Sequence, residues 1–219
     1  MVKCICISDT HGIHDYYIDR KIYKLSIEET GDIFIHAGDF CNTGELYDIL
    51  SFNAWLRNDN IFDKFKYVIL ILGNHDRLFE IDFDYAKSIL DERIILLHDS
   101  GYDCNGIYIY GSAWTLPFNN WAFNVSEDII KKKLSNMEYC DVLVTHGPAY
   151  GILDKAPNKY NLGSKSLYNI IDIKRPKIHI CGHIHHSYGY YKGLDTEHYN
   201  VSLLNEAYNL VNKPTIINI

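Results

Sequence analysis

The sequence has no long hydrophobic run, no CxxC cysteine pair and no excess of basic residues. A membrane-spanning helix needs about 18 or more consecutive apolar residues, and no segment of this chain approaches that length. Residues 1–7 lead directly into a polar cluster, which leaves no room for the apolar core of a signal peptide. We therefore expect a soluble, cytoplasmic protein with no membrane partner.

Cysteine is sparse and scattered. Of the six cysteines, Cys4, Cys6, Cys140 and Cys181 lie inside apolar runs, where a free thiol behaves as a small hydrophobic side chain. We expect reduced core residues of an intracellular protein, with a disulfide as the alternative.

Positive charge is also limited, because 21 Lys and Arg residues stand against 28 Asp and Glu, for a formal net charge of −7. A protein that follows a long nucleic-acid backbone needs clustered Lys and Arg, so we expect no such partner. Small anionic substrates stay compatible if a site carries its own positive charge. The 219 residues, 47% of them hydrophobic, suffice for one core, and we expect a single domain over residues 1–219.

An apolar run over residues 67–72 ends in an unusual polar tetrapeptide, Gly73-Asn74-His75-Asp76. The run has the uncharged, β-branched character of a buried strand. Asn74 offers a neutral oxygen ligand, His75 a proton donor near neutral pH, and Asp76 an acceptor that can orient the imidazole. Alone, the tetrapeptide also fits an ordinary turn.

Four other strand-like segments end in polar clusters of the same kind. They are residues 2–8 before Asp9-Thr10-His11-Gly12, 32–36 before Ala37-Gly38-Asp39, 141–145 before His146-Gly147-Pro148, and 177–181 before Gly182-His183-Ile184-His185-His186. Residues two apart in an extended backbone face the same side. We therefore expect Asp9 and His11 to converge on one point, and His183 and His185 to form a second convergent pair.

Helical spacing of apolar residues predicts helices over residues 44–56, 82–90, 126–136, where Ser126 is the N-cap, and 163–172. Residues 16–27 fit either a loop or an irregular helix. We expect strands over residues 93–97 and 106–111. We expect a final antiparallel meander formed by residues 188–191, 197–203 and 215–219. This alternation predicts an α/β sandwich, in which ligands bind at the carboxyl ends of the strands.

Residues 112–121 interleave aromatic side chains with asparagine. Such side chains can stack on a flat ligand and hydrogen-bond its edge. Trp114, Phe118, Asn120 and Trp121 are therefore candidate substrate-binding residues. The alternative is a long loop held down by its own rings.

Without His75, the strand-end clusters supply seven oxygen and nitrogen donors: Asp9, His11, Asp39, Asn74, His146, His183 and His185. Seven are too many for one four-coordinate metal and fit two metal sites that share one carboxylate. Because no cysteine belongs to the set, Mn²⁺, Fe, Zn²⁺ and Mg²⁺ are all compatible with it.

The ordered motifs DTHG, AGD, GNHD, THGP and GHIH resemble those of the calcineurin-type metallophosphoesterase superfamily over essentially the whole chain. The longer motifs HAGDF, GSAWTLPFNNW, THGPAYGILD and GHIHHSYG resemble its MPPED-type branch, which is related to class III cyclic-nucleotide phosphodiesterases. The resemblance implies a four-layer α/β sandwich of two mixed β-sheets flanked by helices. It also implies two divalent metal ions, Mn²⁺ being the first expectation.

The same resemblance implies a role for each site residue. The implied ligands are Asp9, His11 and His185 for the first metal, Asn74, His146 and His183 for the second, and Asp39 as the bridge. His75 would act on the scissile phosphate as a catalytic residue with Asp76 as its partner, where many relatives have Glu in place of Asp76.

The expected activity is hydrolysis of small phosphodiesters, with cyclic nucleotides as the favoured candidates, by attack of a metal-activated hydroxide on phosphorus. Two divalent ions beside two aspartates and a hydroxide leave the site locally cationic in an acidic protein. The alternatives are a phosphomonoesterase or protein phosphatase, and a non-catalytic metal-binding scaffold.

Overall fold

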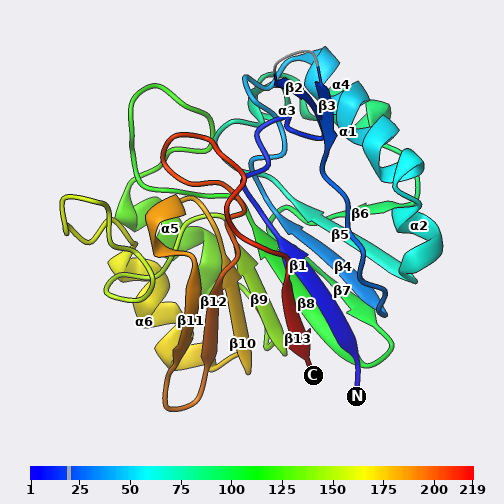
Figure 1. Cartoon of the computed structure of the whole chain (residues 1–219). Helices are drawn as coiled ribbons and strands as arrows, with labels where there is room; N and C mark the ends of the chain where they lie inside the picture. The colour runs from blue at the N-terminus through cyan, green and yellow to red at the C-terminus, as the bar shows by residue number, and fades with distance from the viewer. Residues whose placement is uncertain (19–20) are drawn as a thin grey trace.

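Two β-sheets packed face to face form the centre of the structure, a computed structural model that describes residues 1–18 and 21–219 (Figure 1). In the first sheet the strands lie in the order β13 (Thr215–Asn218), β1 (Lys3–Ile7), β4 (Ile33–Ala37), β5 (Tyr67–Ile71) and β6 (Ile94–Leu96). Strands β1, β4, β5 and β6 run parallel to one another, and β13 pairs antiparallel with β1.

In the second sheet the strands lie in the order β11 (Gly189–Lys192), β12 (Glu197–Asn200), β10 (Ile178–Cys181), β9 (Val142–Thr145), β8 (Ile107–Ser112) and β7 (Ser100–Cys104). The inner strands β12, β10, β9 and β8 are parallel, whereas the edge strands β11 and β7 are antiparallel to their neighbours. Both sheets are therefore mixed.

Alternate residues of the central strands face two different cores. In β1, Cys4 and Cys6 pack between the two sheets, whereas Ile5 and Ile7 pack beneath the helices that cover the first sheet. Strands that are buried on both faces carry apolar residues without alternation. This explains the unbroken apolar runs that predicted them.

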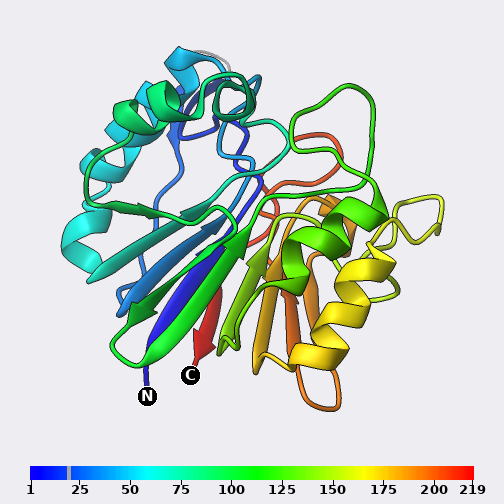
Figure 2. The ribbon, with the colours of Figure 1, turned by 180° about the vertical axis from the view of Figure 1, so that it is seen from behind.

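Helices cover the outer face of each sheet (Figure 1 and Figure 2). The first sheet is covered by α1 (Leu46–Asn58), α2 (Ile61–Lys64), α3 (Arg77–Ile81) and α4 (Phe83–Ile89), and the second by α5 (Glu127–Ser135) and α6 (Lys165–Lys174). In α1, Phe52 and Trp55 are fully buried and belong to the same core as Phe34 of β4. The layers follow the order helix, sheet, sheet, helix, so the predicted four-layer α/β sandwich is confirmed.

Two predicted helices have different limits for local reasons. The helix predicted over residues 82–90 starts only at Phe83, because Asp82 ends α3 and its carboxylate then accepts a hydrogen bond from the Tyr85 N–H to cap α4. Helix α6 begins after Ser164, whose hydroxyl accepts from the Leu167 N–H at 3.0 Å. Ser126 precedes α5 as predicted, but its side chain makes no capping hydrogen bond.

The prediction of a C-terminal antiparallel meander was wrong. Strand β12 is antiparallel to β11 but parallel to β10, and β13 crosses to the edge of the first sheet. Residues 16–27 contain the antiparallel strands β2 (Asp15–Ile18) and β3 (Lys21–Lys24) rather than an irregular helix, while residues 19 and 20 lie outside the described chain. Local patterns do not carry this information, since strand direction depends on tertiary pairing.

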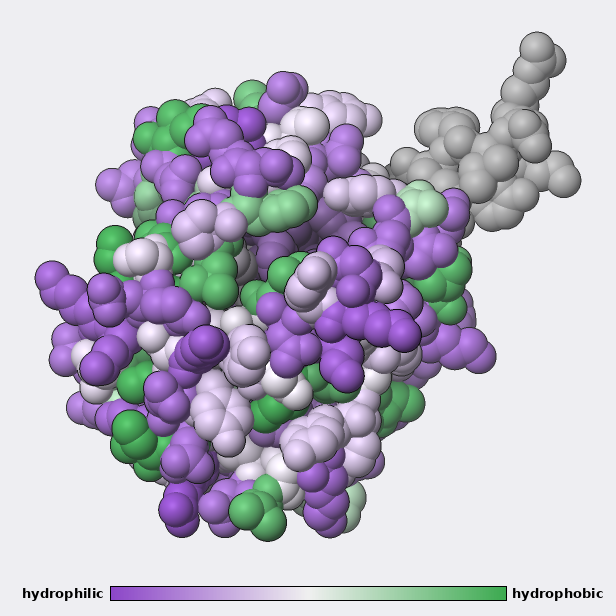
Figure 3. Space-filling view, turned by 90° about the vertical axis from the view of Figure 1, so that its left-hand side faces the viewer, coloured by the Kyte–Doolittle hydropathy of each residue, from purple (hydrophilic) through white to green (hydrophobic). Residues whose placement is uncertain are grey.

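All six cysteines are free and buried, which confirms the expectation of thiols in the core and rules out the disulfide alternative. Within the described residues, no helix combines the length and the apolar character that crossing a bilayer requires. The face shown in Figure 3 is mostly hydrophilic, with hydrophobic residues scattered over it in small groups. Scattered apolar residues of this kind are normal on a protein surface.

Candidate metal centre

The parallel strands of both sheets end at the same edge of the sandwich, at the top of Figure 1. Four residues in the loops that follow these strands have a left-handed backbone: Asp9 (φ 54°), His11 (φ 42°), Asp39 (φ 56°) and His183 (φ 66°). This conformation costs a non-glycine residue about 1–2 kcal/mol. Strain of this kind persists where the surrounding structure over-determines it, which is typical of functional sites.

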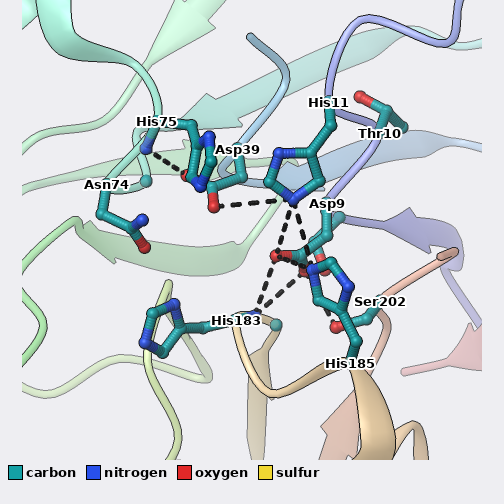
Figure 4. A network of polar contacts seen from close by, with 12 residues as sticks. Asp9, Thr10, His11, Asp39, Asn74, His75, His183, His185 and Ser202 are labelled. Carbon is teal, nitrogen blue, oxygen red and sulfur yellow. Dashed lines mark hydrogen bonds and ion pairs between the residues drawn. The ribbon is translucent and has the colours of Figure 1, made fainter. Parts of the chain in front are cut away.

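The first group of donors consists of Asp9, His11 and His185, all buried or nearly so (Figure 4). The His185 Nε2 atom lies 3.3 Å from Asp9 Oδ1 and 3.2 Å from His11 Nε2. Two ligands about 2.1 Å from one cation lie about 3.0–3.4 Å apart, so these separations fit donors that share one ion. Asp9 Oδ2 accepts the Ser202 hydroxyl at 2.8 Å, which leaves Oδ1 towards the two imidazoles.

The second group consists of Asp39, His146 and His183, with Asn74 beside them. The His146 Nε2 atom lies 3.2 Å from Asp39 Oδ2 and 3.0 Å from Asn74 Oδ1. Asp39 Oδ2 also lies 3.8 Å from His11 Nε2 of the first group. Asp39 therefore stands between the two groups, where a bridging carboxylate would have to be.

Backbone carbonyls fix the tautomers of two of these histidines. His146 Nδ1 donates to the Ala37 carbonyl at 3.0 Å, and His185 Nδ1 donates to the Asn205 carbonyl at 3.1 Å. When the ring is neutral, Nε2 then carries no proton, and its lone pair faces other hydrogen-bond acceptors. A cation or a proton must lie between them, so the residues present fit a metal ion.

The buried carboxylates of Asp9 and Asp39 stabilise positive charge on the neighbouring histidines. Burial alone would lower the pKa of His146, but the charge of Asp39 and its hydrogen bond outweigh burial and raise that pKa to about 9. Burial would also lower the pKa of His185, but the hydrogen bond with Asp9 and the charge of Asp9 outweigh burial and raise that pKa to about 9. Without metal these rings would hold protons, and two divalent ions would replace them.

Two glycines permit the close approach of these loops. A Cβ atom on Gly38, whose φ is 92°, would lie 2.7 Å from His146 Nδ1. A Cβ atom on Gly73 would collide with the Asp39 carboxylate and the His146 ring. Only glycine lets both backbones pass so near the donors.

The expected convergence of His183 and His185 on one point was wrong. The His183 ring lies on the side of Asn74, whereas the His185 ring lies on the side of Asp9 and His11 (Figure 4). Asp9 and His11 do meet, but through left-handed turns rather than an extended strand. The i, i+2 rule fails here because all four residues follow the ends of their strands.

The expected contact between Asp76 and His75 does not form. The Asp76 carboxylate accepts backbone N–H groups of Gly73, Asp39 and Cys41 at 2.7–3.0 Å. His75 Nδ1 instead donates to the Asn42 carbonyl at 2.6 Å. Asp76 stands at the start of α3, and its side chain ties the loops that follow β4 and β5 together.

His75 lies beside both groups of donors, and with His11 and Asp39 it forms a third set of potential metal ligands. Its ring meets His11 edge-on at 4.4 Å and stacks on Trp121 at 3.9 Å with an interplanar angle of 23°. Its backbone N–H donates to Asp39 Oδ1 at 2.7 Å. With Nδ1 engaged by Asn42, Nε2 is free to act in the cleft.

The candidate substrate-binding residues divide into two kinds. Phe118 lines the cleft of about 120 Å³ above the donors, and Trp121 stacks on His75. Trp114 lies elsewhere, because its indole N–H donates to the Asp99 carboxylate at 2.8–2.9 Å and its ring packs against Phe123. Asn120 is exposed, and its side chain forms no hydrogen bond with any described residue.

Sequence reasoning missed the loop that closes the other side of the cleft. Glu206 and Tyr208 line it, and the Tyr208 ring meets His11 edge-on at 4.8 Å. Ser202 and Asn205 hold Asp9 and His185 through the hydrogen bonds described above. The polar, turn-like segment around Asn205 has no pattern that indicates a return to the strand ends, so no local signal could have revealed it.

Comparison with known proteins agrees with this geometry. The calcineurin-like phosphoesterase family model matches residues 2–187. Metallophosphoesterase domain-containing protein 1 of Homo sapiens is 32% identical over 243 residues, covering 99% of this chain and 71% of that protein. A UPF0046 protein of Caenorhabditis elegans is 30% identical, covering 100% of this chain and 60% of its own length.

Solved structures show the same fold at low identity. TT1561 of Thermus thermophilus superposes with a TM-score of 0.61 and 12% identity, over 99% of this chain and 98% of that one. GAP50, the anchor in the inner membrane complex of Plasmodium, gives a TM-score of 0.52 and 12% identity, over 92% and 71%. With the motif order, the fold and the paired donor groups in agreement, the chain belongs to the calcineurin-like phosphoesterase family.

Proposed function

We propose that the protein is a dinuclear metal-dependent phosphodiesterase that acts on small phosphodiesters. The observation that carries the proposal is the pair of donor groups with Asp39 between them, in which the Nε2 atoms of His146 and His185 face carboxylate oxygens at 3.2 Å and 3.3 Å. Two divalent ions held there would lower the pKa of a bound water and polarise the phosphoryl oxygens. Family membership supports phosphoester hydrolysis, and the diester preference is our inference.

Each metal would take its own set of side chains. We assign Asp9, His11 and His185 to the first ion, and Asn74, His146 and His183 to the second, with Asp39 between them. The donors are oxygen and nitrogen only, which is compatible with Mn²⁺, Fe, Zn²⁺ and Mg²⁺ alike; we take Mn²⁺ as the first candidate from the family resemblance.

His75 is the catalytic residue of this proposal. The Asn42 carbonyl fixes its tautomer, Trp121 stacks on its ring, and Nε2 is left without a hydrogen-bond partner among the described residues, while His75 itself lines the cleft. From there it can stabilise or protonate the leaving oxygen. Asp76 acts through the backbone of the neighbouring loops as a positioning residue.

The cleft sets the size of the substrate. Its volume of about 120 Å³ accommodates a phosphoryl group, and Phe118 at its rim offers an aromatic face for a planar substituent. A cyclic nucleotide combines a phosphodiester with such a ring, and we favour it as the substrate class. Because both sheets contribute donors to one centre, residues 1–219 would work as one domain, and the free cysteines support a reducing, cytoplasmic location.

The test uses metal-stripped protein reloaded with Mn²⁺. We expect faster turnover of bis-p-nitrophenyl phosphate than of p-nitrophenyl phosphate, followed by a comparison of 2′,3′-cyclic, 3′,5′-cyclic and linear substrates. A strong monoester preference would favour the phosphomonoesterase or protein phosphatase alternative. Turnover of neither substrate by fully loaded protein would favour the metal-binding scaffold.

A His75→Ala variant tests the catalytic assignment. We expect kcat for the diester to fall at least about 100-fold with unchanged metal content. His186→Ala is the matched control, because His186 is exposed and belongs to none of the three groups of potential metal ligands. Equal activity of the two variants would contradict the role of His75.

A further inference from the structure

The loop of residues 204–210, called here the C-terminal loop, follows β12 and lies at the edge of the sandwich where the parallel strands end (Figure 1). A bridge between Leu204 and Leu210 closes it. Inside it, Asn205 Oδ1 accepts the backbone N–H groups of Ala207 and Asn209, both at 3.0 Å. The loop is therefore a fixed turn.

Two contacts attach this loop to the donors. The Asn205 carbonyl orients His185, and the Tyr208 ring meets His11 and His185 edge-on at 4.8 Å and 5.6 Å. Tyr208 has a left-handed backbone with φ 58°, as do Asp9 and His11. The loop thus forms part of the wall of the cleft, which Phe118 also lines.

Glu206 places a fixed negative charge in that wall. Its Oε1 atom accepts the His186 backbone N–H at 2.9 Å, and the side chain lines the cleft above the donors. Among the described residues, Glu206 belongs to no group of potential metal ligands, forms no ion pair, and has no Lys or Arg beside it in the cleft lining. An unpaired carboxylate in a cleft for phosphate has an electrostatic consequence.

That consequence depends on the charge of the substrate. A phosphate monoester carries a charge close to −2 above its second pKa of about 6, whereas a diester carries −1. Repulsion by Glu206 scales with this charge. Because the cleft is small compared with the Debye length of about 8–10 Å, any phosphoryl group in it feels the carboxylate.

We propose that Glu206 is a specificity-determining residue that selects monoanionic phosphodiesters against dianionic phosphomonoesters. This inference rests on the proposed function of the same centre. The metal ions attract both substrate classes, and Glu206 offsets that attraction twice as strongly for the monoester. Because Glu206 is exposed to solvent, its repulsion of the substrate is moderate. The hydrogen bond from the His186 N–H holds the carboxylate in one position at the cleft.

The experiment compares the Mn²⁺-loaded wild type with Glu206→Gln, which keeps the acceptor for the His186 N–H but removes the charge. At a pH of about 8, the ratio of kcat/KM for p-nitrophenyl phosphate to that for bis-p-nitrophenyl phosphate should rise about threefold or more. The control is Glu138→Gln, an exposed glutamate that precedes β9 at the opposite end of the sandwich; its ratio should not change.

Ionic strength gives a second readout. Raising the salt concentration from about 0.05 M to about 0.5 M should reduce the difference between the wild-type ratio and the Glu206→Gln ratio, because salt screens the Glu206 charge. An unchanged ratio in the variant would overturn the inference. Loss of bound Mn²⁺ from Glu206→Gln would also overturn it, because Glu206 would then support the metal rather than the selection.

The two proposals fail in different ways. A wild-type preference for the monoester, or no turnover of either ester, contradicts the proposed phosphodiesterase activity. A wild-type diester preference that Glu206→Gln leaves untouched contradicts only the inference about Glu206.

Discussion

Two sets of buried histidines lie in neighbouring parts of the second sheet, and they differ in whether a carboxylate faces them. His146 and His185 face Asp39 and Asp9, which raise the pKa of each ring to about 9 against the effect of burial. His179 and His198 lie on β10 and β12. Burial lowers the pKa of His198 to about 4 and that of His179 well below its usual value.

The second pair is held by neutral hydrogen bonds alone. The Thr145 hydroxyl donates to the Gly147 carbonyl at 2.7 Å, so it accepts from His179 Nε2 at 2.8 Å. His179 Nδ1 must then accept from His198 Nδ1 at 3.2 Å. Burial alone therefore does not mark a histidine as a candidate ligand, whereas His146 and His185 are marked by the carboxylate that each of them faces.

Removing the Asp39 carboxylate should have the largest effect on activity. We expect Asp39→Asn to lower kcat/KM for the diester at least about a thousandfold, because both donor groups lose their shared charge. Metal analysis of the purified variant should show loss of bound Mn²⁺. A variant that retains two ions and near-normal activity would contradict the bridging assignment.

Asp76→Asn should give an intermediate effect on both stability and rate. Asparagine keeps one acceptor oxygen and replaces the other with an NH2 group, which must then face either the Cys41 N–H or the N–H groups of Gly73 and Asp39. We expect about 2–3 kcal/mol lower free energy of unfolding and about tenfold lower kcat. Urea unfolding and steady-state kinetics measure these, and an effect on rate without one on stability would instead favour direct catalysis by Asp76.

His198→Phe should affect stability alone. The change leaves His179 Nδ1 without its donor, at a cost of about 1–3 kcal/mol in the free energy of unfolding. Bound metal and kcat should stay within about twofold of the wild type, because neither His179 nor His198 belongs to a group of potential metal ligands. Loss of metal in this variant would break the distinction between the two sets of histidines.

The stability difference between the wild type and His198→Phe should depend on pH, which tests whether His198 is neutral in the folded protein. The pKa of His198 is about 4 in the folded protein and about 6.5 in the unfolded chain. As the pH falls below about 6.5, only the unfolded state gains a proton, so the wild type loses stability that His198→Phe keeps. Between pH about 7 and about 5.5, the stability difference between the two proteins should shrink by about 1 kcal/mol. A constant difference in urea unfolding would contradict a neutral buried His198.

The parts of the centre that lie in motifs could be predicted from sequence, and the parts that depend on tertiary contacts could not. Asp9, Asp39 and His146 each follow an apolar strand, and parallel strands bring such ends together. Glu206 and Tyr208 reach the cleft because an irregular loop folds back, which no periodicity encodes. The fold class was accessible because buried parallel strands and amphipathic helices leave clear patterns.

Two side chains have orientations that their sequence neighbours did not indicate. Asp76 and Trp114 were assigned by their neighbours in sequence, but each side chain is oriented by its strongest available hydrogen-bond partner. For Asp76 that is a set of backbone N–H groups, and for Trp114 it is the Asp99 carboxylate. Both partners come from distant segments, so adjacency to a motif did not predict orientation.

The most direct test of the account is anomalous diffraction from crystals grown with Mn²⁺. The account predicts two manganese peaks, one among Asp9, His11 and His185 and one among Asn74, His146 and His183, with Asp39 touching both. A single peak, or peaks that do not contact Asp39, would contradict the dinuclear centre.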